Sequence, residues 1–527
     1  MAQSFHPDQA QTTLFTGLLA ASRRHGGAKI VVEDADGTSL TYSRLVLASL
    51  VLGGRLARET QKGENVALLL PNAAGLLVTL LGLNAFGRVA ALLNFTAGKK
   101  QIASALQTGQ IRTVLTSRRF LKAAKLEDLA EAISATEYAP GQRVRLVALE
   151  DVRASLGTVD KLLGAARASI ARVIGHGPVH DPAAPAVTLF TSGTEGAPKG
   201  VVLTNANLMA NVLQALTHLG DALVPGEILF NPLPMFHSFG LTAGTLVPVM
   251  GGVKCVLYPS PLHYRQIPKC IQKAQATFMV ATDTFVGGYA RAAEPGQLDT
   301  LKYVVCGAER VKEQTRKLVE HAKTVLLEGY GVTETAPVLA VNQPSANRPG
   351  TVGSLMPGVE ARLEPVPGLS EGQRLFVRGP NVMAGYLLPD RPGVLVPPKD
   401  GWHDTGDIVT IDDGYITIRG RAKRFAKLGG EMVSLAAVES IAAGLWPDAQ
   451  HVALSLPDAR KGEQLVLVTD EPEASKEALL AHARKEGLPE LWVPKALLVV
   501  ASIPVLASGK VDLQATHDMA RQARPLL

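Results

Sequence analysis

The fold is decided by the stretch Thr188-Leu-Phe-Thr191-Ser192-Gly193-Thr194-Glu195-Gly196-Ala-Pro198-Lys199-Gly200, an apolar strand that runs into a loop of hydroxyl residues and glycines. Glycines let consecutive backbone N–H groups converge on an anion, hydroxyls add donors, and a lysine brings a mobile positive charge to phosphate oxygens. The stretch therefore predicts a phosphate-binding loop after a buried strand, and the competing interpretation is a surface turn. It is not a Walker A loop, because Pro198 and Gly200 occupy the two positions that distinguish that motif.

Short apolar runs alternate with helical stretches on both sides of this loop. Runs of β-branched and aliphatic residues, spaced by segments of helix length, are typical of βαβ units in buried sheets. The sequence therefore predicts an α/β fold. The expected strands include residues 66–70, 112–116, 145–149, 187–191, 253–257, 277–281 and 301–306, and a helix is expected over residues 75–86.

The C-terminal part of the chain has a different residue pattern, with more frequent turn-forming residues. From Thr351 onward, frequent Gly and Pro residues predict a β-rich subdomain, and Asp413-Gly414 between two β-type stretches predicts a hairpin. The remaining residues suit a small, mobile α+β lid, so we predict a large N-terminal domain over residues 1–418 and a lid over residues 419–527. The lid is expected to hold helices at 434–444 and 475–485 and strands at 451–456, 464–468 and 496–500.

Four further motifs follow the loop along the chain. They are Gly329-Tyr330-Gly331-Val-Thr333-Glu334, Trp402-His403-Asp404-Thr405-Gly406-Asp407, Gly420-Arg421-Ala-Lys423-Arg424-Phe-Ala-Lys427 and Ser508-Gly509-Lys510-Val-Asp512. With the loop, they resemble in order the phosphate, Mg-ATP, ribose, hinge and catalytic-lysine motifs of the adenylate-forming (AMP-binding) superfamily. That superfamily includes acyl-CoA and acyl-ACP synthetases, and the resemblance covers about residues 30 to 515.

The resemblance implies an ATP site, a Mg²⁺ ion and a catalytic set. Glu334, a hard oxygen ligand, would hold Mg²⁺, and Thr333 would contact the α-phosphate. Lys510 would bridge the carboxylate and α-phosphate oxygens as charge builds between them, and Lys423 would be the hinge residue. Without the resemblance, Glu334 could be a helix N-terminal acid and Lys510 a solvated lysine. The residues implied to bind ATP are Thr191, Ser192, Gly193, Thr194, Gly196 and Lys199, then Gly307, Ala308 and Glu309 as an adenine wall, then Gly329, Tyr330 and Gly331, and Asp407 with Arg421 at the ribose.

Three positions leave alternatives open. His237, in Asn231-Pro-Leu-Pro234-Met-Phe236-His237-Ser238, resembles a family residue near the acyl pocket, but a histidine among apolar residues is equally a packed core residue. Glu195 stands where many members have a hydroxyl residue, and a carboxylate beside phosphates is expected to point away or meet a cation. Lys423 stands where aspartate is common, so the pairing of the hinge is not predicted.

The subfamily resemblance concerns the acceptor of the acyl group. Segments such as Asn94-Phe95-Thr96-Ala97-Gly98 and Asn347-Arg-Pro-Gly-Thr-Val-Gly353 resemble the acyl-ACP synthetase part of bacterial bifunctional 2-acylglycerophosphoethanolamine acyltransferases. The single H-x₄-D pattern, from His176 to Asp181, lies in a Pro/Gly-rich stretch, so no acyltransferase activity is inferred. We expect a ligase that activates a fatty acid as acyl-AMP and passes it to acyl carrier protein. The alternatives are a fatty acyl-CoA synthetase and a non-catalytic adenylate-binding protein.

Composition excludes several other classes of protein. The chain has 527 residues, a formal net charge of +6 and only 5% aromatic residues, which argues against nucleic-acid binding. Its three cysteines are too few for a disulfide framework. The first eight residues lack a basic start before an apolar core, so no signal peptide is expected. The apolar region 66–93 is interrupted by Pro71, Asn72, Asn84 and Arg88. We therefore expect a cytoplasmic protein, with peripheral contact at the inner membrane left open. The basic segment 421–427 suggests Arg424 as a contact for an acidic carrier protein.

Overall fold

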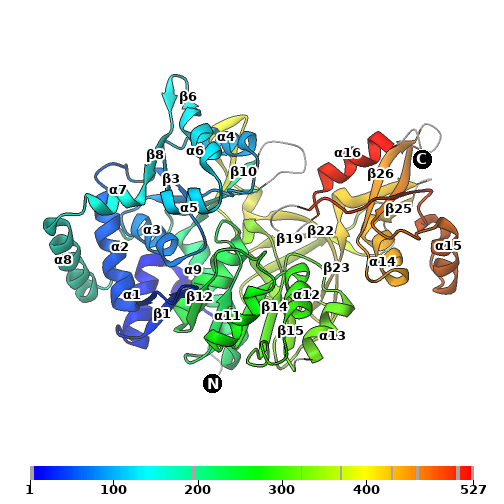
Figure 1. The fold of residues 1–527 in the computed structure, drawn as a ribbon, viewed down its shortest axis with the longest axis horizontal. Helices are drawn as coiled ribbons and strands as arrows, with labels where there is room; N and C mark the ends of the chain where they lie inside the picture. Colours follow the sequence, from blue (N-terminus) through cyan, green and yellow to red (C-terminus); the bar gives the residue numbers. More distant parts are fainter. Residues whose placement is uncertain are drawn as a thin grey trace. The chain divides into compact units, whose positions relative to one another are not determined.

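The computed structural model describes residues 5–191, 198–321, 323–367, 369, 371–428, 431–458, 462–505 and 511–523. Packing divides the chain into two compact units, shown in Figure 1. The first comprises residues 1–349, 355–360 and 378–403, and the second comprises residues 350–354, 361–377 and 404–527. The predicted α/β architecture with a smaller C-terminal domain is confirmed. A moving boundary after residue 418 stays a prediction, because a unit defined by packing can contain a hinge.

The first sheet of the first unit contains the strand before the phosphate loop. Its strands β3, β4, β5, β8 and β9 run parallel, and β10 turns back antiparallel to β9. The order is β21-β20-β10-β9-β4-β3-β5-β8. The bounds are β3 (Asn65–Leu69), β4 (Val89–Leu92), β5 (Thr113–Thr116), β8 (Arg145–Ala148), β9 (Pro185–Thr191), β10 (Lys199–Thr204), β20 (Gly385–Leu388) and β21 (Arg391–Val396).

The second sheet of the first unit confirms the predicted βαβ units. Parallel strands β11 to β15 alternate with helices, and β16 returns antiparallel to β15. Within this unit the order is β16-β15-β14-β13-β11-β12-β1-β2. The bounds are β1 (Ile30–Asp34), β2 (Ser39–Thr41), β11 (Ile228–Asn231), β12 (Lys254–Leu257), α11 (Gln266–Ala274), β13 (Phe278–Ala281), α12 (Asp283–Ala292), β14 (Tyr303–Cys306), α13 (Glu313–His321), β15 (Val325–Gly331) and β16 (Val338–Val341).

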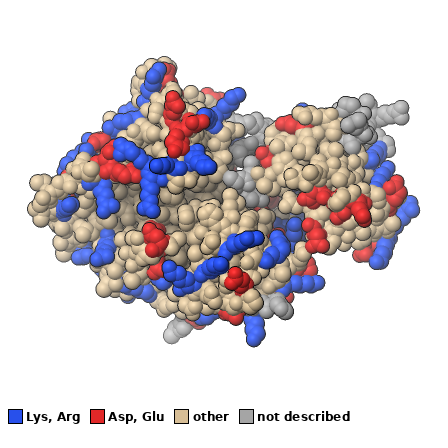
Figure 2. Space-filling model, viewed as in Figure 1, with Lys and Arg blue, Asp and Glu red and all other residues tan. Residues whose placement is uncertain are grey.

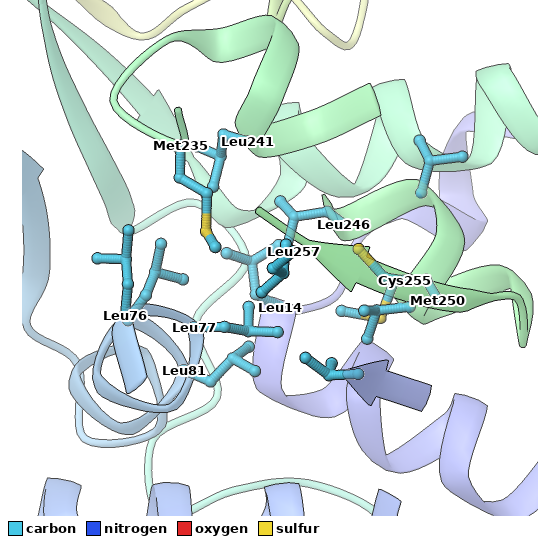
Figure 3. Close-up of a cluster of buried hydrophobic side chains, with 14 of the residues drawn as sticks. Leu14, Leu76, Leu77, Leu81, Met235, Leu241, Leu246, Met250, Cys255 and Leu257 are labelled. Atoms are coloured by element: carbon cyan, nitrogen blue, oxygen red, sulfur yellow. The ribbon is translucent and has the colours of Figure 1, made fainter. Parts of the chain in front are cut away.

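Helix α3 (Ala74–Ala85) occupies the centre of the core of the first unit. Ten of its twelve residues are buried, which is typical of a helix packed between other elements on all sides. Figure 3 shows Leu76, Leu77 and Leu81 of this helix facing Met235, Leu257 and other residues that come from distant parts of the chain. The apolar region 66–93 is therefore core: it forms β3, α3 and β4, as predicted. None of the helices in the described ranges has the length and apolarity that a membrane span requires.

The second unit contains the β-rich part and the C-terminal part. Strands β22 and β23 form the predicted hairpin, and Asp413 and Gly414 both take positive φ, at 50° and 79°, as a two-residue type I′ turn requires. The β-rich strands are β18 (Glu360–Glu364), β19 (Gln373–Arg378), β22 (His403–Asp412) and β23 (Tyr415–Arg421). The C-terminal elements are β24 (Phe425–Leu428), β25 (Glu431–Ser434), α14 (Leu435–Leu445), β26 (His451–Asp458), β27 (Gly462–Thr469), α15 (Lys476–Lys485), β28 (Ala496–Val499) and α16 (Leu513–Ala523).

The other elements of the first unit cover these sheets or connect their strands. They are α1 (Leu14–His25), α2 (Tyr42–Leu56), α4 (Lys99–Thr108), α5 (Arg118–Ala123), α6 (Glu127–Ala135), β6 (Glu137–Ala139), β7 (Gln142–Arg143), α7 (Leu149–Ala154), α8 (Thr158–Ile174), α9 (Asn205–Leu219), the π-helix Phe239–Leu246 and α10 (Val247–Gly251).

Asp34, the last residue of β1, gives the fold a testable dependence on pH. Its Oδ1 accepts a hydrogen bond from the backbone N–H of Ala74 at 2.8 Å, at the start of α3. Burial raises the pKa of this carboxyl from its ordinary value of 3.8 to about 6. Because the folded-state pKa lies above the unfolded value, the folded state is progressively destabilised as the pH rises from about 4 to 6.

Asp34→Asn is therefore expected to raise the Tm relative to the parent protein at pH 8 more than at pH 4, as measured by thermal unfolding. Asp36→Asn is the matched control, because hydrogen bonding to Thr38 lowers the pKa of Asp36, so its removal has the opposite sign at pH 8. A Tm difference for Asp34→Asn that is the same at both pH values would contradict the assignment.

Candidate ATP-binding site

The predicted phosphate loop joins two paired strands. Thr191 ends β9 and Lys199 begins β10, and the two are direct partners across the antiparallel pair. The two ends of the loop are thus held side by side, at the ends of two neighbouring strands of the first sheet. Four of the predicted ATP-binding residues lie outside the described residues: Ser192, Gly193, Thr194 and Gly196, together with Glu195.

Tyr386 connects the phosphate-loop lysine to the predicted magnesium ligand. The Lys199 Nζ atom lies 5.3 Å from the centroid of the Tyr386 ring, within the range of a cation–π contact. The Tyr386 hydroxyl donates a hydrogen bond to Oε1 of Glu334 at 2.7 Å. The structure therefore brings together Lys199 and Glu334, which are 135 positions apart in the sequence.

Sequence reasoning missed Tyr386. It lies in β20, which pairs antiparallel with β10 so that Tyr386 stands opposite Val201. Tyr386 belongs to none of the five motifs, and only the register of two strands that are distant in the sequence places it beside Lys199. An aromatic residue in a short strand carries no signal of that pairing, because its period of two is shared by every strand.

A tight turn holds Glu334 in place. β15 ends at Gly331, a one-turn 3₁₀ helix spans Thr333–Thr335, and the chain returns as β16. A Cβ on Gly331 would lie 2.0 Å from the carbonyl oxygen of Pro337, so only glycine fits this approach. The carbonyl of Glu334 accepts a hydrogen bond from the N–H of Met383 at 2.8 Å, so the stretch that carries Tyr386 also fixes the backbone of Glu334.

The predicted adenine wall follows β14, and the Gly329–Gly331 motif ends β15. These strands are parallel neighbours, so their carboxyl ends meet at one edge of the sheet, where ligands of open α/β sheets bind. A Cβ on Gly307 would lie 3.5 Å from the carbonyl oxygen of Gly329, which shows how near the two motifs are. Oε2 of Glu309 accepts a hydrogen bond from the N–H of Thr284 at 3.0 Å, so this carboxylate is bound to the first turn of α12.

In the second unit, the structure brings together Asp407 and Arg421. They are direct partners across the β22–β23 hairpin, and the Arg421 Nε atom lies 3.2 Å from Oδ1 of Asp407. Asp407 is buried, with 3% of its side chain exposed, whereas 62% of the Arg421 side chain is exposed. A buried carboxylate fixed by a surface guanidinium is a rigid acceptor for neighbouring hydroxyls.

His237 lies in an aromatic cluster of the first unit. Its ring centroid is 4.7 Å from that of Phe236, and Phe95 lies 5.0 Å from Phe236 in an edge-on contact. His237 is half-buried and lies two residues before the start of the π-helix, a rare element that often occurs at functional sites. Both interpretations of His237 therefore keep support: it packs among aromatic rings, and it does so beside an irregular helix.

Two predicted residues of the C-terminal region are not described in full. Lys510 lies outside the described residues, and of Lys423 only the backbone is described, in the 3₁₀ turn Ala422–Arg424. Arg424 as a contact for a carrier protein stays a prediction: 25% of its side chain is exposed, and its guanidinium already has partners within its own unit. Its guanidinium donates to Oε1 of Glu439 at 2.7 Å and to the carbonyl of Ala453 at 2.9 Å, so it ties the turn to α14 and β26.

Comparison with known proteins relates this geometry to characterised chains. A family model described as AMP-binding enzyme matches residues 18–387. A long-chain-fatty-acid–CoA ligase of Salmonella typhimurium is 31% identical over 347 residues, which cover 63% of this chain and 61% of the ligase. The chain thus matches less than two thirds of that relative. A medium-chain fatty-acid–CoA ligase of Escherichia coli is 27% identical over 92% of this chain and 86% of its own length.

The comparison of structures agrees at the level of the fold. The crystal structure of the anthranilate CoA ligase AuaEII, in complex with anthranoyl-AMP, superposes with a TM-score of 0.79 at 19% identity. The superposition covers 97% of this chain and 98% of the ligase. The names of these three proteins all specify coenzyme A, so the resemblance to acyl-ACP synthetases is not confirmed by them.

Proposed function

Because the chain belongs to the AMP-binding enzyme family, we propose that it is an AMP-forming ligase that activates a fatty acid with ATP and transfers the acyl group to coenzyme A. The observation that carries the proposal is the linked set Lys199, Tyr386 and Glu334 beside the ends of the phosphate loop. The fatty-acid–CoA ligases among the relatives favour coenzyme A over acyl carrier protein as the acceptor.

The first step joins two anions. A carboxylate oxygen of the fatty acid attacks the α-phosphorus of ATP, the bond to the bridging oxygen breaks, and pyrophosphate leaves with that electron pair. Lys199, Thr191 and the loop between them would hold the β- and γ-phosphates, while Thr333 would contact the α-phosphate. Lys510 would neutralise the charge shared by the carboxylate and α-phosphate oxygens, which is the largest electrostatic demand of the step.

A magnesium ion fits the residues that are present. Mg²⁺ in nucleotide sites is usually held by one or two carboxylates together with substrate phosphates. Glu334 presents one half-buried carboxylate, oriented by Tyr386 and close to the loop lysine. Across the described ranges, no group of three His, Cys, Asp or Glu residues could bind a metal ion without a substrate. When bound, Mg²⁺ would supply positive charge to the phosphates of ATP.

For the nucleoside, we propose for each group of residues the role that its motif implies. Gly307 and Ala308 would present backbone to the adenine, since the carboxylate of Glu309 is bound to α12. Gly329, Tyr330 and Gly331 end the neighbouring strand, and their small or flat side chains leave room for a ring. Asp407, oriented by Arg421, would accept hydrogen bonds from the ribose hydroxyls.

The second step is a thioester exchange. The thiolate of the acceptor attacks the acyl carbon of acyl-AMP, a tetrahedral intermediate forms, and AMP leaves as the C–O bond breaks. Rotation of the C-terminal part about Lys423 would move the surface that carries Lys510 away from the acyl-AMP. A different surface of the same part would then face the acyl-AMP and admit the thiol. His237, beside the π-helix, is proposed to gate the acyl site.

The proposal is tested by pyrophosphate release with Mg-ATP and a fatty acid, followed by thioester formation with coenzyme A or acyl carrier protein. We expect pyrophosphate release that depends on the fatty acid, with coenzyme A the better acceptor. No release with any fatty acid would favour the non-catalytic adenylate-binding protein, and preference for the carrier protein would favour the acyl-ACP synthetase.

Lys427 is a better probe of the acceptor than Arg424. Its side chain is exposed, and its backbone N–H, which bonds Oε2 of Glu463 at 2.5 Å, is unaffected by a change of side chain. For a coenzyme A ligase, Lys427→Gln is expected to leave kcat/KM for coenzyme A within about twofold of the parent value. A single exposed charge contributes little to the binding of a small substrate. A large loss with acyl carrier protein alone, measured in parallel, would support the carrier protein as the acceptor.

Tyr386→Phe tests the linked set directly. The variant keeps the ring beside Lys199 but removes the hydroxyl that orients Glu334. We expect adenylation to fall about tenfold, the usual worth of a hydrogen bond to a charged group, together with a higher Mg²⁺ requirement. Tyr289→Phe is the matched control, since this buried hydroxyl donates to the carbonyl of Pro261 instead. An unchanged Mg²⁺ requirement in Tyr386→Phe would show that Tyr386 is only a packing residue.

A further inference from the structure

Three acidic residues are buried in the part of the chain that the structure describes. The sequence has 47 Asp and Glu residues, and Figure 2 shows several of their side chains at the surface. The buried three are Asp283, Glu328 and Asp407, with exposed fractions of 4%, 7% and 2%. Burying a carboxylate is costly, so each buried acid needs a structural explanation. Asp407 stands at the proposed ribose site and Glu328 directly precedes the Gly329–Gly331 motif, whereas Asp283 belongs to none of the motifs.

Asp283 begins helix α12, which lies beside α13 in Figure 1. Its Oδ1 accepts a hydrogen bond from the backbone N–H of Lys312 at 2.9 Å. In the opposite direction, Oε2 of Glu309 accepts a hydrogen bond from the N–H of Thr284 at 3.0 Å. We call residues 307–312, which include the predicted adenine wall, the wall segment. Two carboxylates thus form reciprocal bonds between the wall segment and the first turn of α12.

The wall segment contains a strained residue. Ala308 has a φ of 68°, in the left-handed region that residues with a Cβ rarely adopt. Such strain persists only where surrounding contacts fix the backbone, and it is found most often at ligand sites. On the N-terminal side of Ala308, the N–H of Gly307 donates to the carbonyl of Ala281 at 3.2 Å. On its C-terminal side, the bonds of Asp283 and Glu309 fix the chain.

We propose that Asp283 and Glu309 are positioning residues, which hold the wall segment in the strained conformation that receives the adenine of ATP. The inference rests on the proposed function for the identity of the ligand, and it assigns the new role to Asp283. Without the two carboxylates, only a few per cent of the molecules would keep Ala308 at positive φ. The apparent Kd for a ligand rises in inverse proportion to the fraction of molecules able to bind it.

The first test measures the Kd of Mg-ATP by calorimetry without a fatty acid, so that no turnover is needed. Asp283→Ala with Glu309→Ala should raise this Kd at least about tenfold. Asp283→Asn with Glu309→Gln should keep it within about threefold of the parent value, because the amide oxygens can accept the same N–H groups.

Ala308→Gly tests whether the carboxylates act by holding the strained backbone. Glycine populates positive and negative φ about equally, so about half of the molecules would remain able to bind. Adding Ala308→Gly to the alanine pair should therefore bring the Kd of Mg-ATP back to within about threefold of the parent value. A cooperative thermal transition shows that each variant is folded. If the alanine pair is unfolded, Asp283→Ala alone should raise the Kd about fivefold, and Ala308→Gly should reverse that loss.

Inorganic tripolyphosphate separates a positioning role from a general loss of structure. Its Kd should change less than about twofold in the alanine pair, because the phosphate loop belongs to the other sheet. Asp34→Ala is the matched control, since it removes a carboxylate that accepts an N–H at the start of another helix, α3. It should change neither Kd more than about twofold.

The outcomes separate this inference from the proposed function. Unchanged ATP binding by the alanine pair, equal weakening of ATP and tripolyphosphate binding, or failure of Ala308→Gly to restore binding overturns the positioning role. A parent protein that binds ATP but releases no pyrophosphate with any fatty acid refutes the proposed function, and the positioning role then stands on the binding data. A parent protein that binds no ATP overturns both.

Discussion

Lys510→Ala is expected to lower the rate of adenylation about a thousandfold while leaving the second half-reaction nearly intact. The cationic side chain is needed only where the carboxylate and α-phosphate oxygens share developing negative charge, and one preorganised donor at such a site contributes a factor of about 10²–10³. Once acyl-AMP has formed, the leaving group departs without that contact. Supplied acyl-AMP and coenzyme A should therefore give thioester at close to the parent rate.

The two half-reactions are measured separately, by pyrophosphate release and by conversion of synthetic acyl-AMP to thioester. Lys495→Ala is the matched control, because Lys495 is an exposed lysine of the same compact unit that belongs to none of the motifs. Loss of both half-reactions to the same extent in Lys510→Ala would mean that this lysine supports the fold of the unit rather than the first transition state.

Glu334→Gln is expected to lower adenylation at least about a hundredfold at low Mg²⁺, with partial recovery at high Mg²⁺. The structure makes this substitution informative. The amide oxygen of glutamine can still accept the Tyr386 hydroxyl, and the backbone contact with Met383 does not involve the side chain. The change therefore removes the negative charge and little else, so the lost rate reports the electrostatic contribution of the carboxylate to metal binding.

The measurement is the initial rate of pyrophosphate release across a Mg²⁺ titration. Glu309→Gln provides the control at the same edge of the second sheet, since its side chain can still accept from the N–H of Thr284. It should change the rate less than about threefold and leave the Mg²⁺ dependence unaltered. A rate for Glu334→Gln equal to that of the parent at low Mg²⁺ would make Glu334 a structural residue of its turn.

The sequence predicted those parts of the fold that depend on local pattern. Strands such as β3 and β9, helix α3 and the Asp413-Gly414 hairpin lie within a few residues of their expected positions, because periodicity and turn chemistry are local properties. The pairing of Asp407 with Arg421 follows from that hairpin. Tyr386 could not be predicted, because its place beside Lys199 depends on which strand pairs with β10 on the side away from β9.

The surface of an element can be predicted only when it is known which side of the element faces the protein. A basic cluster in the sequence predicts free positive charge at the surface, yet the guanidinium of Arg424 is hydrogen-bonded to Glu439 and to the carbonyl of Ala453. In α8 the alternation of small and large residues marks a two-sided helix, but periodicity alone does not say that the small side is the inner one. Only packing against α2 settles that orientation.

The central position of α3 has a consequence for synthesis of the chain. On the ribosome, α3 and the strands β3 and β4 appear early, whereas Met235 and Leu257, which share its core, follow about 150 residues later. At roughly 5–20 residues per second, this delay lasts on the order of 10–30 s. During that time the leucine-rich helix lacks the residues that later cover one of its sides. The nascent chain therefore exposes a strongly apolar segment, and we expect a chaperone to cover this segment until the rest of the core has been made.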